Sequence, residues 1–189
     1  IKNFRIIPAL NEEAFVKALP AQGDRFDFSV SNIEIQNIDL PQLLKENIVA
    51  DNILLPSASL KIYRDLAKPR DKKDRTGAYP HQLMQKIPVI FQVKKIVVTN
   101  GFIEYKERHN VSRKAGKAQY YNVNASITNF TNDKKAIAGN NVMTAELNTR
   151  FLNKSPLHIT GQFYLLHPKG RFDVKGTFGT MDATFLNPV

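Results

Sequence analysis

Apolar and polar residues alternate with a period of two along most of this chain. Phe26, Phe28 and Val30 alternate with polar residues, and the same alternation recurs in later segments. These segments are residues 33–38, 60–62, 91–98, 123–127, 157–165 and 172–178. Because successive side chains of a strand point to opposite faces of a sheet, the pattern predicts half-buried strands. We therefore expect a mainly β protein built on an antiparallel sheet.

Two turns are predicted to close hairpins between these strands. Asn100-Gly101 separates two strand-like runs, and both residues tolerate the positive φ of a two-residue hairpin turn. That turn would pair Val98 with Ile103 and Ile96 with Tyr105, so that all four side chains share one face. The second turn is expected over residues 167–170, which contain Pro168 and Gly170.

Two or three short helices are expected beside the sheet. Asn11 and Asp39 are suitable N-caps for helices that begin at the following residues. A third helix is predicted within residues 79–87, ending before Pro88. Residues 67–78 and 108–117 are rich in basic side chains and lack apolar periodicity, so they are expected to be exposed loops.

An internal repeat is visible in the first half of the chain. The pattern Phe-x-Val-x-x-Ile-x-Ile/Val-x-Asn occurs in residues 28–37 and again in residues 91–100. A strand that contains Tyr followed by a base and an acid comes after each copy, in residues 60–65 and 102–107. Repeated units of this kind bury their apolar faces by stacking on their neighbours. Residues 26–66 and residues 89–108 onward are therefore expected to be two related strand units of one domain, 26–189, preceded by an N-terminal extension, 1–25, with a short helix.

Composition narrows the chemistry available to the protein. The 189 residues are 42% hydrophobic, enough for a folded core, and contain no cysteine, which excludes disulfides and thiolate chemistry. A net charge of +10 favours binding to polyanions such as nucleic acid, anionic lipid or anionic glycan. No segment is long and apolar enough to span a bilayer, and the first residue is Ile rather than Met. A signal or anchor segment upstream of Ile1 is therefore compatible with the sequence.

No catalytic or metal-binding motif is recognisable. The four histidines lie far apart in sequence, and no glycine-rich phosphate loop or nucleophile elbow is present. We expect no enzymatic activity, no cofactor and no metal. Nucleic-acid binding is disfavoured, because the basic residues lie in predicted loops and no RNA- or DNA-binding motif accompanies them.

Three segments resemble the strands of AsmA-like proteins, the superfamily of bacterial envelope proteins that includes TamB. They are the repeated Phe-x-Val-x-x-Ile unit, the run Ala125 to Asn132, and the run Phe172 to Asp182 that continues into residues 185–188. The resemblance covers most of residues 26–189. It implies an elongated, curved antiparallel sheet, a β-groove with a hydrophobic inner face, in a protein anchored in the inner membrane and lying in the periplasm. It also implies transport of phospholipid to the outer membrane, or outer-membrane assembly and homeostasis, without catalytic residues.

The resemblance, combined with the alternation, suggests which residues would form the groove. The candidate lipid-lining residues are Ile96, Val98, Ile103, Tyr105, Phe163, Leu165, Phe172 and Val174. The candidate basic rim, placed to contact lipid headgroups, comprises Lys68, Arg70, Lys72, Lys73, Arg75, Arg113 and Lys114. The expected partners are phospholipid or another acyl lipid, and other envelope proteins.

A second interpretation of the same pattern remains open at this point. The apolar strand faces would also fit the closed core of a sandwich-like fold, which is the usual fate of such faces. In that case the protein would be a binding module that docks a protein or glycan partner.

Overall fold

The computed structural model describes residues 1–72, 74, 76–182 and 184. In this part of the chain, 52% of the protein is strand and 13% is helix, so the predicted mainly β fold is confirmed. The strands are β1 Lys2–Ile6, β2 Asp24–Asn32, β3 Glu34–Gln36, β4 Ile48–Pro56, β5 Ser59–Asp65, β6 Phe91–Arg108, β7 Ala115–Thr131, β8 Val142–Phe151, β9 Ser155–Tyr164 and β10 Phe172–Phe178. The helices are α1 Glu12–Ala18, α2 Leu40–Leu43, α3 Pro80–Met84 and α4 Lys134–Gly139.

The ten described strands form one open sheet, in which most neighbours are antiparallel. The main order is β1-β2-β5-β6-β7-β8-β9-β10, and β3 pairs with β4. The strands β4 and β5 follow one another along the same side of β6, and both run parallel to it. The sheet is therefore mixed rather than wholly antiparallel. No second sheet packs against it among the described residues, so the sandwich-like form is not the one observed.

The predicted hairpin at Asn100-Gly101 is wrong, because β6 continues through both residues. Val98 lies opposite Ala125 and Ile103 lies opposite Tyr120, so Val98 and Ile103 do not pair. Asn100 does adopt the expected positive φ of 51°. Asn100 forms part of a β-bulge instead of a turn, because a bulge can also include a residue with positive φ. The second predicted hairpin is confirmed, with Phe163 opposite Phe172.

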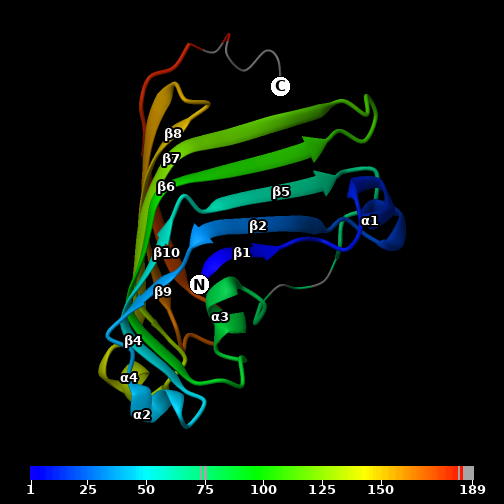
Figure 1. The fold of residues 1–189 in the computed structure, drawn as a ribbon. Coiled ribbons are helices and arrows are strands. Elements are labelled where there is room, and N and C mark those ends of the chain that lie inside the picture. The colour runs from blue at the N-terminus through cyan, green and yellow to red at the C-terminus, as the bar shows by residue number, and fades with distance from the viewer. Residues whose placement is uncertain (73, 75, 183, 185–189) are drawn as a thin grey trace.

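Bulges in neighbouring strands line up across the middle of the sheet. Ser57, Asn100 and Asn122 have φ values of 53°, 51° and 50°, and the register of β6 with β7 shifts on both sides of Gly101. Aligned bulges bend each strand at the same level. Figure 1 shows the result: β6 and β7 run sideways in their upper parts and then turn downward, so the whole sheet is curved.

The predicted helices are confirmed in outline. The Asn11 side chain accepts a hydrogen bond from the Ala14 amide, and the Asp39 side chain accepts one from the Gln42 amide, as N-caps do. A fourth short helix, α4, was not predicted; it begins after Asp133, whose side chain accepts a hydrogen bond from the Lys135 amide. Of the two predicted loops, the second is shorter than expected, because β6 extends to Arg108 and β7 begins at Ala115.

The strands that follow the two copies of the predicted repeat lie side by side, whereas β4 separates β3 from the first half of β6. The strand β5 and the second half of β6 are parallel neighbours, with Leu60 opposite Ile103. In each, the tyrosine hydroxyl donates a hydrogen bond to the acid two residues later, Tyr63 to Asp65 and Tyr105 to Glu107. The N-terminal segment joins the same sheet, since β1 pairs with β2.

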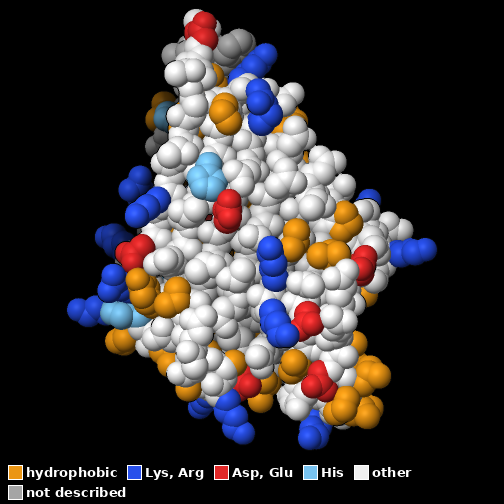
Figure 2. Space-filling model, turned by 90° about the vertical axis from the view of Figure 1, so that its left-hand side faces the viewer, with side chains coloured by type: hydrophobic (Ala, Val, Ile, Leu, Met, Phe, Trp, Pro, Cys, Tyr) orange, Lys and Arg blue, Asp and Glu red, His pale blue; other side chains and the backbone are white. Residues whose placement is uncertain are grey.

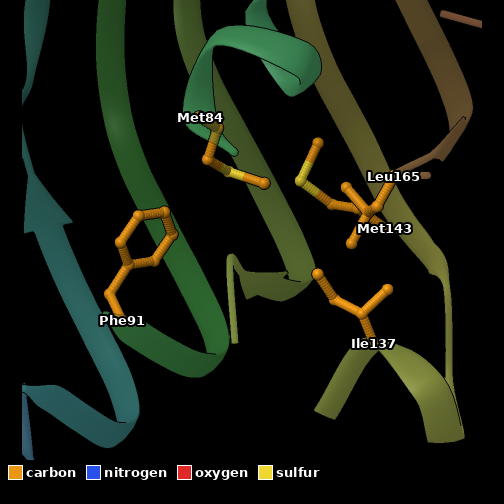
Figure 3. Close-up of a cluster of buried hydrophobic side chains, with 5 residues drawn as sticks. All are labelled: Met84, Phe91, Ile137, Met143 and Leu165. Atoms are coloured by element: carbon orange, nitrogen blue, oxygen red, sulfur yellow. The ribbon is translucent and has the colours of Figure 1, made fainter. Parts of the chain in front are cut away.

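The buried core is small for a chain of this length. Its main cluster is formed by one residue each from α3, β6, α4 and β8, and by a residue that follows β9 (Figure 3): Met84, Phe91, Ile137, Met143 and Leu165. This cluster lies below the bend, where α3 packs on the inner side of the curved sheet (Figure 1). Within the described part of the chain, much of the sheet's apolar surface consequently has no second layer of structure over it.

Candidate functional site: the inner apolar face

Apolar side chains form rows that cross the sheet from strand to strand. Residues directly opposite each other in neighbouring strands share a face. One row runs through Ile53, Ile96, Ile127, Ala145, Gly161 and Val174. The next runs through Leu55, Val98, Ala125, Leu147, Ile159 and Gly176. The two rows cross six strands, β4, β6, β7, β8, β9 and β10, and both are apolar over their full length.

The same face continues across the bend. A side chain added at Gly101 would meet Val98 and Val123, so these three positions point to one side. Two residues further along β6, Ile103 lies opposite Leu60 and Tyr120. This row extends through Phe28 to Ile6 at the edge of the sheet. We call the combined surface of these rows the inner apolar face, because crowding at Gly101 places it on the inside of the bend.

The eight lining residues predicted from the sequence all lie on this side of the sheet. Four are on β6, and Phe163, Phe172 and Val174 come from β9 and β10. Val174 is 53% exposed and available to a ligand, whereas Leu165 is 2% exposed and belongs to the buried core. Leu165 can therefore support the inner apolar face but cannot contact a ligand on it.

The helix α3 covers one part of the inner apolar face and leaves the rest open. Its His81 ring packs against the rings of Phe163 and Phe172, at centroid distances of 5.6 and 6.3 Å. Its Gln85 side chain donates a hydrogen bond to the Thr131 carbonyl. Toward the β1 edge, by contrast, Ile6 and Phe26 remain exposed.

The opposite, outer face of the sheet is polar. One row of register partners there comprises Asn52, Lys95, Thr128, Thr144, Gln162 and Asp173. Thr128 and Thr144 are joined by a hydrogen bond of 2.5 Å between their hydroxyl groups. Figure 2, which views the molecule from this side, shows few hydrophobic side chains over the middle of the sheet. The two faces thus differ sharply in character, as a sheet with one solvated side requires.

The predicted basic rim is only partly assembled at the ends of the strands. Arg70 lines a shallow hollow with Arg64 and Glu107, beside the ends of β5 and β6. Lys114 lies in the exposed turn between β6 and β7. Lys68 and Lys72 belong to the segment that leads from β5 to α3. Lys73 and Arg75 lie outside the described residues.

Arg113 is held by a buried carboxylate and does not face the inner side. Its guanidinium donates two hydrogen bonds of 2.7 Å to Asp65, one to each oxygen. Asp65 also accepts a hydrogen bond from the Ala67 amide, and Arg108 approaches it at 3.9 Å. The Arg113 hydrogen bonds hold the pKa of Asp65 below its usual range, although burial acts in the opposite direction. The pair fastens the β6–β7 turn to the end of β5.

His81 is a buried side chain with an unsatisfied polar atom. It is 2% exposed, and its Nε2 atom has no hydrogen-bond partner among the described residues. Burial lowers the pKa of His81, against a smaller opposing effect of a hydrogen bond with the Gly170 backbone. Burial therefore favours the neutral form of the imidazole inside the fold.

Acidification should destabilise the protein through His81. Because the folded pKa lies below that of the unfolded chain, the unfolded state takes up the proton first as pH falls below about 6.5. We expect wild-type stability to decrease between about pH 7 and pH 5, and the variant His81→Phe to show a weaker decrease over the same window. Urea denaturation followed by circular dichroism at several pH values measures both. If the stability of the two proteins depended equally on pH, His81 would not be the source of the acid sensitivity.

Several residues that shape this site could not be found from the alternation. Met84 and His81 lie on α3, which the sequence placed as a helix but not on any face of the sheet. Ile137 lies on the unpredicted α4. The signal that could have found Met84 and Ile137 is an apolar residue four positions after Pro80 or after the capping Asp133, about one helical turn further along.

Two comparisons of the sequence with known proteins gave no match. No protein-family model matches the sequence. No curated protein matches it either.

The described residues contain no cluster of three or more His, Asp or Glu side chains suited to a metal ion. In the same part of the chain, no helix is long and apolar enough to cross a membrane.

Proposed function

We propose that the inner apolar face binds the acyl chains of phospholipid or a related lipid. The protein would then be a non-enzymatic, periplasmic segment of an AsmA-like envelope protein, taking part in lipid transport to the outer membrane or in outer-membrane homeostasis. One observation carries the proposal: apolar rows run unbroken across the curved sheet, and among the described residues the helices cover them in part. An uncovered apolar surface of this kind usually marks a binding site.

The chemistry of the face suits acyl chains better than a polar ligand. Its first two rows consist of Ile, Leu, Val, Ala and Gly residues, which carry no hydrogen-bonding side-chain groups that would fix one orientation. Each buried methylene contributes about 0.8 kcal/mol, whatever its position along the chain. Acyl chains would therefore be held firmly overall yet remain able to slide from one row to the next.

Cations at the strand ends support a role for lipid headgroups. The exposed side chains of Arg70 and Lys114 lie where β5, β6 and β7 begin or end. A phosphate group held there would let its acyl chains reach the inner apolar face. The sequence resemblance to AsmA-like proteins supports the same arrangement and supplies the proposed cellular setting.

The test compares lipid binding by a variant of the inner side of the sheet with that of a variant of the outer side. Val174 and Thr177 are both exposed on β10, Val174 on the inner side and Thr177 on the outer side. We expect Val174→Asp combined with Phe26→Asp to lower bound phospholipid about tenfold, because each carboxylate opposes burial of a chain beside it. The matched control Thr177→Asp should bind as the wild type does.

Protein purified without detergent supplies the measurement. Lipid extraction and mass spectrometry give the phospholipid bound per chain, and circular dichroism verifies the fold of each variant. A folded wild-type protein that carries no lipid and takes up none from added phospholipid would overturn the proposal. So would a folded double variant that retains the wild-type lipid content.

A further inference from the structure

The helix α2 presents its apolar residues to solvent instead of to the protein. Leu40, Leu43 and Leu44 are 61%, 43% and 88% exposed. The polar Gln42 points inward instead, where its side chain accepts a hydrogen bond from Asn47. Surface helices normally bury their apolar stripe, so this arrangement is inverted.

A second exposed apolar segment lies beside α2. The Ile48 amide donates a hydrogen bond to the Ile90 carbonyl, which joins the segment after α2 to the segment before β6. In that second segment Ile87, Val89 and Ile90 are all exposed. We call Leu40, Leu43, Leu44, Ile87, Val89 and Ile90 the apolar tip. Figure 1 places α2 at the end of the molecule opposite the β6–β7 turn, and Figure 2 shows hydrophobic side chains gathered toward this end.

Exposed lysines flank the segments of the apolar tip. Lys45 follows α2, Lys86 precedes Ile87, and Lys134 and Lys135 begin α4. The helix α4 is adjacent, because the side chain of Asn132 donates hydrogen bonds to the carbonyls of Ile87 and Val89. The acidic residues of these segments are Asp39, Asp133 and Glu46, of which the first two cap helices. The local charge is therefore slightly positive, on a chain whose net charge is +10.

We propose that the apolar tip docks on the surface of an anionic phospholipid bilayer. Leu43 and Leu44 enter the boundary between headgroups and acyl chains, as the apolar side of an interfacial helix does. The lysines contact lipid phosphates, and the positive charge of the whole chain attracts it to the surface. Projecting leucines with lysines beside them match such an anionic surface more closely than an uncharged one. The inference is independent of the inner apolar face, since it involves different residues.

Vesicle flotation tests the proposal. The purified chain is mixed with vesicles of phosphatidylcholine alone, or of phosphatidylcholine with phosphatidylglycerol, and the fraction that floats is measured. We expect about tenfold more protein to float with the anionic vesicles. The double variant Leu43→Asp/Leu44→Asp should lose that binding. Val111→Asp is the matched control, because Val111 is 80% exposed in the turn at the other end of the molecule.

Each other result has a definite meaning. Flotation of folded Leu43→Asp/Leu44→Asp at the wild-type level would show that charge alone holds the protein, and would overturn the proposal. Absence of wild-type flotation would also overturn it and would leave the apolar tip to a protein partner. Val174→Asp/Phe26→Asp should float normally. If that variant alone failed to float, the inner apolar face would be the membrane contact, and the proposal for the tip would be wrong while lipid binding stood.

Discussion

Replacing Gly101 with valine is expected to lower the free energy of unfolding by about 2 to 3 kcal/mol. A Cβ atom at this position would lie 3.0 Å from the Ala58 carbonyl oxygen and 3.3 Å from the Cβ of Val123. The carbonyl belongs to the backbone of the neighbouring chain segment and cannot rotate away as a side chain could. Gly101→Ala should cost about 1 kcal/mol, and the larger branched side chain should cost more.

Urea denaturation followed by far-ultraviolet circular dichroism measures this series. Gly139→Ala is the control, because nothing lies within 4 Å of a Cβ at Gly139. It should match or slightly exceed wild-type stability, since alanine favours helix more than glycine does. An unchanged urea midpoint for Gly101→Val would show that the bend has room for a side chain, and the close approach of the strands would be disproved.

Substituting Asp65 with alanine is the second change for which we expect a large effect, a loss of about 2 to 3 kcal/mol. The side chain is buried, and it accepts hydrogen bonds from Arg113, from the Ala67 amide and from the Tyr63 hydroxyl. Its removal leaves the Tyr63 and Ala67 donors without this acceptor and releases the β6–β7 turn from β5. The guanidinium of Arg113 can return to water, which keeps the cost below that of a fully buried pair.

The Lys94–Asp51 ion pair supplies the control for Asp65. The charged groups of Lys94 and Asp51 also lie close together, but this pair is exposed to solvent. Lys94→Ala should therefore leave the urea midpoint nearly unchanged. The pH dependence gives a second check. Because the folded pKa of Asp65 is lowered, its stabilisation is present above about pH 4 and is lost as pH falls through the folded pKa. Asp65→Ala should lack this acid-dependent component; equal acid sensitivity in both proteins would contradict the structure.

The strands could be predicted from the sequence because their signal is local. Alternation over residues 26–30 or 172–178 depends only on neighbouring residues, and both segments are strands. The caps Asn11 and Asp39 are equally local, since each side chain binds an amide three residues later. The shared face of Ile96 and Val98 with Ile103 was also expected correctly, although for the wrong reason. A bulge, rather than a hairpin, keeps them on one side.

The error at Asn100-Gly101 shows where local information ends. The same two residues allow either a hairpin turn or a bulge, because both conformations need a positive φ. The choice depends on β7 and on the β4–β5 pair, which flank β6 over its full length and satisfy its backbone hydrogen bonds. No residue within a few positions of Asn100 carries that information.

The candidate site, like the fold, could be predicted from the sequence only in part. The apolar composition of each strand followed from the sequence, and so did the basic character of residues 68–72 and 113–114. The sequence did not indicate that Arg113 would bind Asp65, 48 positions away, because opposite charges at that separation have many possible partners. It also did not indicate that α2 would expose its leucines, since a capped apolar helix ordinarily faces a core.

By itself, then, the sequence determined that this protein is a mainly β chain in whose strands apolar and polar residues alternate. Those properties arise from the period of the side chains and from capping, which act over a few residues. Only the tertiary structure decided that the strands form one open, bent sheet, that α3 covers part of its inner side, and that Leu165 is buried while Val174 is exposed. Those outcomes depend on contacts between residues distant in sequence, and many different pairings satisfy the same local pattern.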